Sequence, residues 1–329
     1  MPKRILVPLD GSKTALTALP PALALAERDG ARIFLATAAH TLPPVTVKDG
    51  SGAGRQPAGG WFEEERKRAR TYLAELREEI GETSVEIEVR ILSGRAVGAL
   101  SHAAEELEVD LIVMTSHGRG RLERLWIGSV ADGLIREGPC PILLWRPGWD
   151  QVSGPDAPLP DPDQLPEAAA DLASRPAFRK ILIPLDGSGL SESILPHVRT
   201  LAEPGATGLH LVSVVPPAPR LPSAYLPDEV KREESRREQT EELRRYLESR
   251  ADTLRSEGFT VDIGIVQDEP PAEGILARRR AVGADLVALS TRGQGGVARL
   301  VTGSVADKVI RAGQVPVLVH RPRMEVETR

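Results

Sequence analysis

The most constraining feature of this sequence is an internal duplication. Residues 5–12 read ILVPLDGS, and residues 181–188, 176 positions further on, read ILIPLDGS. A second block begins DLIVMTSHGRG at Asp110 and DLVALSTRGQG at Asp285, 175 positions apart. Solenoid repeats recur at intervals of about 20–50 residues. Two separate blocks that share almost one spacing therefore indicate two copies of a whole domain within the 329 residues.

A proline-rich stretch separates the two copies. Residues 147–178 contain seven prolines. Proline lacks an N–H group and fixes φ, so such a stretch forms neither a long helix nor a central strand. We expect an extended linker here, with one helical turn at 167–173, between a first domain at residues 1–146 and a second domain at residues 179–329.

Apolar periodicity predicts the same alternation of strands and helices in both copies. Residues 4–9 form a continuous apolar run, which is typical of a strand buried on both faces. The first copy is predicted to have further strands at 33–38, 85–92, 111–115 and 142–145, helices at 14–28, 62–80, 97–107 and 130–136, and a glycine-rich loop at 50–60. The second copy is predicted to have strands near 180–185, 209–214, 260–266, 286–290 and 316–320, and a long helix near 228–257. This alternation predicts an open parallel α/β sheet with helices on both faces.

Composition excludes several classes of function. The 42 Lys and Arg against 47 Asp and Glu give a net charge of −5, which leaves no positive excess for a nucleic-acid backbone. Aromatic residues make up only 3% of the chain, too few for base-stacking platforms. Cys140 is the only cysteine, so no internal disulfide forms. The chain shows neither a signal peptide nor an apolar run that could span a bilayer, and we expect a cytoplasmic protein without a membrane partner.

The second repeated block supplies a candidate anion site. Ligands of open α/β sheets bind beyond the carboxyl ends of the strands, where the strand order reverses. In each copy a glycine follows the fourth strand, and a Gly-Ser pair ten positions later opens the last helix. Glycine lets the backbone approach an anion, and a helix N-terminus attracts phosphate. We interpret the serine as the helix cap, with Asp132 and Asp307 close to a capping box. An ordinary glycine turn is the alternative, and the recurrence of the motif in both copies disfavours it.

An acidic residue ends the first strand of each copy. Asp10 and Asp186 each begin the sequence Asp-Gly-Ser. A carboxylate at this place can accept hydrogen bonds from ribose hydroxyls. It can equally form an Asx turn that caps the following helix, and the sequence leaves both interpretations open.

Other catalytic and nucleotide-binding motifs are missing. No GxxxxGK[ST] sequence occurs, and the GxGxxA sequence at 293–298 follows the wrong strand and lacks the acidic residue of a dinucleotide site. His117 is replaced by Arg292 in the second copy, and a Ser116–His117–Asp10 triad has no nucleophile elbow. The histidines show no metal-site spacing. We predict no catalytic residue and no protein-bound metal.

Together the repeated motifs resemble the universal stress protein family, in its tandem form with two such domains. The nucleotide signature of that family is Gly-x2-Gly-x9-Gly followed by Ser or Thr. Its second and third glycines match in both copies, at Gly118 and Gly128–Ser129 and at Gly293 and Gly303–Ser304. Thr115 and Ser290 occupy the place of its first glycine, so each site receives an added side chain there.

The resemblance implies a five-stranded parallel sheet of order 3-2-1-4-5 in each domain, of the adenine nucleotide alpha hydrolase-like type. It implies a site for ATP or a related adenine nucleotide, with any Mg²⁺ held through the phosphates, and adenine near the end of the second strand. It also implies that residues 141–145 and 316–320 pair the two domains within a chain, or pair two chains in a homodimer. The nucleotide-binding residues that it implies are Pro8, Asp10, Ala38, Thr115, Gly118, Gly128, Ser129 and Val130, and then Pro184, Asp186, Val214, Ser290, Gly293, Gly303, Ser304 and Val305.

The leading hypothesis for function is an ATP-binding regulator of the stress response, with slow hydrolysis or none. The loss of the first glycine supports an alternative, an interaction scaffold of the same fold that binds no nucleotide. A weak ATP-hydrolysing enzyme is a third hypothesis, and the lack of a general base shared by both copies argues against it.

Overall fold

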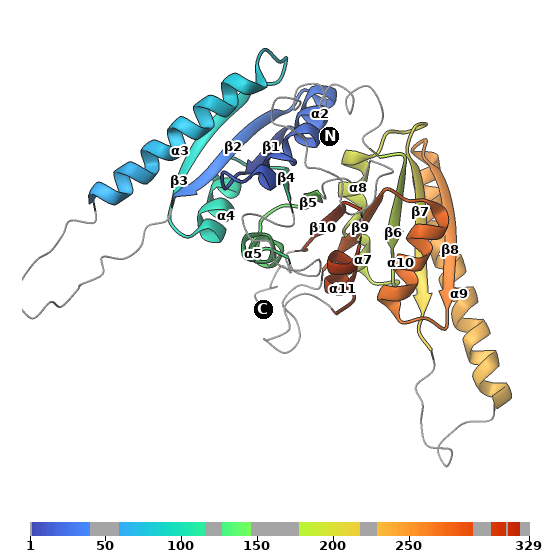
Figure 1. Cartoon of the computed structure of the whole chain (residues 1–329). Coiled ribbons are helices and arrows are strands. Elements are labelled where there is room, and N and C mark those ends of the chain that lie inside the picture. The colour runs from blue at the N-terminus through green and yellow to red at the C-terminus, as the bar shows by residue number, and fades with distance from the viewer. Residues whose placement is uncertain are drawn as a thin grey trace, which may run out of the picture.

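The computed structural model describes residues 2–39, 59–115, 127–145, 178–217, 229–291, 304–313 and 315–322. Its strands form one ten-stranded sheet with the order β3-β2-β1-β4-β5-β10-β9-β6-β7-β8 (Figure 1). We call the half that contains β1–β5 the first domain and the half that contains β6–β10 the second domain. Within each half the order is 3-2-1-4-5 and the neighbouring strands are parallel, so the predicted fold is confirmed.

The strands lie close to where the apolar runs placed them. The first domain contains β1 (Arg4–Pro8), β2 (Arg32–Ala39), β3 (Ile87–Ser93), β4 (Leu111–Thr115) and β5 (Ile142–Trp145). The second domain contains β6 (Lys180–Pro184), β7 (Gly208–Val215), β8 (Thr260–Gln267), β9 (Leu286–Ser290) and β10 (Val317–His320). The continuous apolar runs are buried on both faces because helices cover both sides of the sheet.

Two helical layers sandwich the sheet. One face carries α1 (Lys13–Leu16), α2 (Leu19–Asp29), α3 (Gly59–Ile80), α7 (Gly189–Glu192), α8 (Leu195–Leu201) and α9 (Glu229–Ser256). The other face carries α4 (Ala96–Glu106), α5 (Ser129–Glu137), α10 (Pro271–Val282) and α11 (Ser304–Ala312). Each layer has its own apolar cluster, and both clusters run through the two domains.

Two helix predictions need correction. The helix expected at 14–28 is broken into α1 and α2, because Pro20 and Pro21 lie in the first turn of α2, where proline starts a helix rather than continuing one. The loop expected at 50–60 ends earlier, since α3 already begins at Gly59. The helical turn expected at 167–173 lies outside the described residues.

The two domains meet at β5 and β10, the only antiparallel neighbours among the strands of the described residues. Leu318 lies opposite Leu143, flanked by Val317 opposite Leu144 and Val319 opposite Ile142. These six side chains are between 0% and 2% exposed. Burial of aliphatic side chains stabilises by about 1.5–3 kcal/mol each, so this junction is a continuous part of the apolar core.

A polar contact joins the two domains at the ends of α2 and α8. Arg28 donates from its guanidinium to the carbonyl oxygens of Thr200 and Leu201, each at 3.2 Å, and to the Glu203 carboxylate at 3.0 Å. Asp29 holds the same guanidinium through two bonds of 2.7 Å. A cation at the C-terminus of α8 complements the helix dipole, so Arg28 links the first domain to a helix end of the second.

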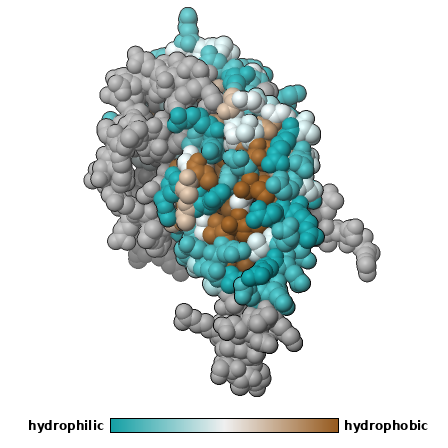
Figure 2. Space-filling model, turned by 90° about the vertical axis from the view of Figure 1, so that its right-hand side faces the viewer, coloured by the Kyte–Doolittle hydropathy of each residue, from teal (hydrophilic) through white to brown (hydrophobic). Residues whose placement is uncertain are grey.

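The strands β3 and β8 form the two edges of the sheet. Figure 2 faces the β8 edge and shows an apolar strip surrounded by polar surface. Partly exposed apolar side chains at this edge belong to Ile263, Ile265 and Val266 of β8, which pack against the clusters beneath α9 and α10.

Candidate functional site

Each domain has a topological switch point at its first strand, where the order of the strands reverses. In the first domain β1 lies between β2 and β4, and the helices on the two sides of this point cover opposite faces. In the second domain β6 lies between β7 and β9 in the same way. The carboxyl ends of these strands carry Pro8, Thr115, Pro184 and Ser290. The predicted strand-end residues therefore lie together at the carboxyl ends of the strands in each domain, where open α/β sheets bind ligands.

An Asx turn follows β1. The carboxylate of Asp10 accepts hydrogen bonds from the Ser12 backbone N–H at 2.9 Å and from the Ser12 hydroxyl at 2.6 Å. The Ser12 hydroxyl in turn caps α1 by accepting from the Ala15 N–H at 3.1 Å. Gly11 has φ of 79°, in the left-handed region that glycine adopts without strain. The turn chemistry is thus present, and it holds an exposed carboxylate in a fixed orientation at the switch point.

The second domain repeats this turn. Asp186 accepts from the Ser188 N–H at 3.0 Å and from the Ser188 hydroxyl at 2.5 Å, and Gly187 has φ of 84°. Burial alone would raise the pKa of Asp186, but the hydrogen bonds from Ser188 and Ser191 hold this pKa below its usual range. The carboxylate is therefore kept ionised, so that both of its oxygens act only as hydrogen-bond acceptors.

A hydroxyl residue on the second strand fixes the start of each turn, which the sequence reasoning missed. Thr37 donates to the carbonyl oxygen of Leu9 at 2.9 Å, and Ser213 donates to that of Leu185 at 2.6 Å. Both hydroxyls sit 176 positions apart, the spacing of the Asp-Gly-Ser repeats. That recurrence of a hydroxyl inside an apolar strand was the available signal.

The capping interpretation of the last helix is wrong in its details. Gly128 is the N-cap of α5, with φ of −58° and ψ of 148° and no side-chain capping bond, and Ser129 is the first helical residue. Asp132 pairs instead with Arg136 at 2.7 Å, and Asp307 of α11 pairs with Arg311 at 2.8 Å. Because Gly128 has no side chain, α5 has no capping box, and each of the two carboxylates pairs with the arginine four residues on, on the same face of its helix.

The amino end of α5 is nevertheless suited to an anion. Its first backbone bond runs from the Asp132 N–H to the Gly128 carbonyl at 2.9 Å, so the amides of Ser129, Val130 and Ala131 precede the helical ladder. Ser129 is exposed. Free N–H groups and the positive end of the helix dipole both favour a phosphate here.

The residues that replace the first glycine differ between the domains. Thr115 is buried, 6% exposed, at the end of β4. Ser290 is half-buried at the end of β9, and its hydroxyl shares a hydrogen bond of 2.8 Å with the hydroxyl of Ser193, which follows α7. The added side chains are therefore part of the packing beneath each site.

Comparison with known sequences decides the family. A sequence profile of the universal stress protein family matches residues 1–146 and 177–321. The chain belongs to this family. The two matched segments make it a tandem member, as the duplicated motifs predicted.

Individual relatives agree with this membership. A universal stress protein of Mycobacterium tuberculosis is 27% identical over 221 residues, 65% of this chain, and this match spans 62% of the length of that relative. One from Thermus aquaticus is 36% identical over 146 residues, which cover 44% of this chain and 98% of that protein. The crystal structure of a universal stress protein from Archaeoglobus fulgidus matches with a TM-score of 0.67 and 20% identity, covering 97% of this chain and 98% of that one. This last likeness shows that the fold is shared.

The remaining predicted site residues of this tandem protein fall into two groups. Ala38 lies near the end of β2, Val214 near the end of β7, and Ser304 and Val305 open α11. Val214 faces α10, since its methyl groups lie 3.1 and 3.3 Å from the position that a Cβ on Gly274 would take. Outside the described residues are Gly118, Gly293 and Gly303, together with His117 and Arg292.

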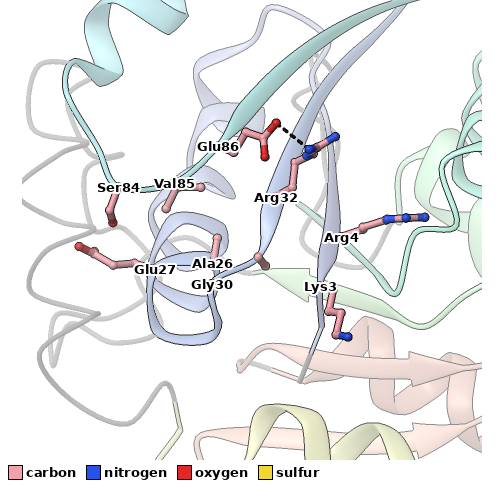
Figure 3. Close-up of a pocket in the computed structure, with 10 residues that line it drawn as sticks. Lys3, Arg4, Ala26, Glu27, Gly30, Arg32, Ser84, Val85 and Glu86 are labelled. Carbon is pink, nitrogen blue, oxygen red and sulfur yellow. Dashed lines mark ion pairs between the residues drawn. The ribbon is translucent and has the colours of Figure 1, made fainter.

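A separate depression of about 570 Å³ lies at the amino-terminal ends of the strands, where β1 and β2 begin. Several of its charged groups take part in the fold: Arg32 pairs with Glu86 at 2.7 Å (Figure 3), and Arg4 donates to the Leu107 carbonyl at 3.0 Å. It lies on the amino-terminal side of the strands, away from the switch point. Within the described residues, no helix is long and apolar enough to cross a membrane.

Proposed function

We propose that each domain of this tandem universal stress protein binds ATP or a related adenine nucleotide at its switch point, and that the protein acts as a cytoplasmic regulator of the stress response. One observation carries the proposal. In both domains an Asp-Gly-Ser turn presents an oriented carboxylate after the first strand, beside the strand that leads to the last helix.

The parts of this site would bind different parts of the nucleotide. Asp10 and Asp186 would accept hydrogen bonds from the ribose hydroxyls, because their carboxylates are held open to solvent by the serine two residues on. The amino ends of α5 and α11 would bind the phosphates. Adenine would lie near Ala38 and Val214, and Mg²⁺ would be held through the phosphates.

The proposal also covers the division of the chain into two domains and the contact between them. We place the domains at residues 1–146 and 179–329, joined by 147–178, with β5 and β10 as their contact in solution. The fully buried antiparallel junction supports this pairing. Exposed strand edges are prone to association, and here each domain covers that of the other.

The first experiment asks whether the protein carries nucleotide. Denaturation of the purified protein, followed by absorbance and mass spectrometry, should release adenine nucleotide, and calorimetry with ATP should give two sites per chain. Neither release nor binding would favour the scaffold alternative, for which the side chains of Thr115 and Ser290 are the supporting observation.

Substitutions at the first site make this test specific. Gly128→Val should abolish ATP binding to the first domain, because the backbone could no longer approach the phosphates. Gly98→Val in α4 is the matched control, since Gly98 is exposed and an added Cβ would have no atom within 4 Å. Unchanged affinity in the Gly128→Val protein would overturn the proposed anion site.

The acidic residues can be separated from the turns that hold them. Asp10→Ala should weaken the first site about tenfold or more, through the loss of charge-assisted hydrogen bonds of about 1.5–3 kcal/mol, and leave the second intact. Asp186→Ala should do the reverse. Ser12→Ala keeps the carboxylate and the bond that it accepts from the backbone N–H of residue 12, but removes the hydroxyl bond to Asp10 and the cap of α1. An equal loss in Ser12→Ala would show that Asp10 acts only through local structure.

A further inference from the structure

The second domain has three histidines on its sheet and on the helix α8, one of them buried and two half-buried, and they lie on both faces of the sheet. The first, His210 on β7, is 3% exposed. Arg278 of α10 donates its Nε–H to Nε2 of His210 at 2.9 Å. A ring nitrogen that accepts carries no proton, so the proton of this neutral imidazole is on Nδ1. That atom is buried and has no hydrogen-bond partner among the described residues.

The Arg278–His210 pair is packed against the backbone of β8. A Cβ added to Gly264 would lie 2.9 Å from Nε of Arg278 and 2.9 Å from Nε2 of His210, closer than real contacts allow. The absence of a side chain at Gly264 therefore makes room for the pair. The guanidinium of Arg278, the imidazole of His210 and the backbone of β8 are therefore in close contact while α10 lies on the sheet.

The charges that face His210 come from three elements. Arg278 of α10 and Lys180 of β6 are cations, and Asp262 of β8 lies opposite His210 in the sheet. Burial, and then the charge of Arg278, lower the pKa of His210 to about 4, although Asp262 acts in the opposite direction. The surroundings therefore favour the neutral ring.

The other two histidines stack against each other on the opposite face. The rings of His197, on α8, and His320, at the end of β10, have centroids 4.1 Å apart and are inclined by 49°. Nδ1 of His320 is buried with no partner in the described part of the chain. Burial and the neighbouring His197 lower the pKa of His320 to about 4, and burial lowers that of His197.

Among the described residues, few charges could stabilise a protonated ring at this second place. Beside His320, the end of β9 contributes the hydroxyl of Ser290, bonded to Ser193. The strand on the other side of β10 is β5, whose residues Ile142–Trp145 are all apolar. The group that bears electrostatically on His320 is His197 itself.

The first domain has no titratable group at these three places. At the spacing of the two repeats, Phe34 stands in place of His210, Pro21 in place of His197 and Trp145 in place of His320. Ala103 stands in place of Arg278. Phe34 and Trp145 are 3% and 5% exposed, so they fill the corresponding interior with apolar groups.

We propose that the second domain is an acid-sensing module: protonation of His210 and of the His197–His320 pair releases α10 and α8 from the sheet, while the first domain stays closed. A protonated His210 would carry a proton on Nε2, which would then face the N–H of Arg278. Two donors and two positive charges cannot remain 2.9 Å apart. Two protonated rings at 4.1 Å would repel each other in the same way.

The direction of the pH effect follows from linkage. An opened domain exposes histidines with an ordinary pKa near 6.5, whereas the closed fold holds that of His210 and His320 near 4. The open state therefore binds more protons between these two values. Closure is fully favourable above pH 6.5 and is progressively lost as the pH falls toward 4.

Hydrogen exchange measured by mass spectrometry on the full chain tests this proposal. With rates corrected for the intrinsic effect of pH, the opening equilibrium at pH 5 should exceed that at pH 7.5 by up to about 30-fold for each of His210 and His320. The increase should appear in α10, β7 and α8. The equivalent elements of the first domain, α4, β2 and α2, should change less than twofold.

Variants that copy the first domain should remove the response. His210→Phe with Arg278→Ala installs the Phe34 and Ala103 arrangement, and should abolish the acid-induced exchange in α10. His197→Leu with His320→Leu should abolish it in α8. His102→Ala is the control, because His102 is exposed on α4, and it should respond like the wild type.

Nuclear magnetic resonance of the histidine rings in the wild-type protein keeps the test independent of whether the variants fold. We expect the His210 signal to titrate well below pH 6. Its titration should coincide with the loss of protection from hydrogen exchange in α10. The proposal is overturned if His210 and His320 titrate near pH 6.5 with the domain closed. Equal acid exchange in both domains, or none down to pH 4.5, would overturn it as well.

Discussion

The two domains share one backbone design and support it with different chemistry. Beneath the Asp10 turn, α1 buries Ala15 and Leu16 in the apolar cluster that also contains Leu76 of α3. Beneath the Asp186 turn, α7 buries no residue. In the second domain Ser191 stands in place of Ala15, Glu192 in place of Leu16 and Arg250 in place of Leu76. The last equivalence follows from aligning Tyr72–Leu73 with Tyr246–Leu247.

In the second domain, the packing beneath the Asp186 turn is held by polar interactions. Glu192 of α7 accepts from Nε of Arg250 on α9 at 3.1 Å, and the Ser191 hydroxyl accepts from the Asp186 N–H at 3.2 Å. Arg250 also lies over the ring of Tyr246, 5.7 Å from its centroid. Burial and the neighbouring Glu192 raise the pKa of Tyr246 to about 12, which keeps its hydroxyl protonated.

The comparison shows that the strands define this fold and that the helical walls can vary. Apolar contacts are insensitive to pH and salt, whereas ion pairs, hydroxyl bonds and buried histidines respond to both. The first domain is therefore the less responsive half of the molecule and the second the more responsive half. Three sets of substitutions can break or sharpen this contrast.

The largest effect is expected at the junction of the domains. Leu318→Asp places an unpaired charge at a position that is 0% exposed, between Leu143 and Ala288, at a cost of several kcal/mol, about 4 or more. The domains should separate while they remain tethered, so that each can be compared alone. Small-angle scattering should show an expanded, two-lobed particle, and Leu318→Met should scatter like the wild type. A compact, equally heat-stable Leu318→Asp protein would exclude this junction as the domain contact.

A smaller effect is expected from the Arg28 contact between the domains. Arg28→Ala should destabilise the protein by about 2–4 kcal/mol in urea unfolding, because it strands the Asp29 carboxylate, whose side chain is 0% exposed. The contact runs one way only, since Pro204 stands at the place of Arg28 in the second copy. Glu203→Gln removes one charge and keeps the other bonds, so its loss should stay below about 1 kcal/mol. Equal losses in the two variants would show that Asp29 finds another partner.

The smallest effects distinguish the two walls directly. Leu16→Ala should cost about 2–3 kcal/mol through the loss of buried methyl groups. Glu192→Ala should cost less than about 1 kcal/mol, because the side chains of Glu192 and Arg250 are 23% and 41% exposed and solvent screens the pair. Urea unfolding with and without 1 M salt, a concentration at which screening acts over about 3 Å, should reduce only the second loss. A salt-sensitive Leu16→Ala loss would contradict the contrast.

Several features of this protein were determined by the sequence alone. The duplicated blocks identified two domains of one family, and the unbroken apolar runs of β1 and β6 identified strands buried on both faces. The Asp-Gly-Ser turns were also readable, since glycine at Gly11 and Gly187 is needed for the left-handed backbone that a turn requires. These signals are local, because they lie within a few residues of what they specify.

Other features were decided only by the tertiary structure. Ser129 looked like a cap and is the first helical residue, because the non-helical backbone of the cap position falls on Gly128, and the Asp132 carboxylate pairs with Arg136. Thr37 reaches the Leu9 carbonyl 28 residues away, Arg278 reaches His210 across 68 residues, and Arg28 reaches Leu201 across 173. Periodicity shows which side of a helix or strand is buried, but not which residue of a distant element lies against it. That choice depends on the register and packing of the whole sheet, so partners this far apart in sequence become visible only when the chain is folded.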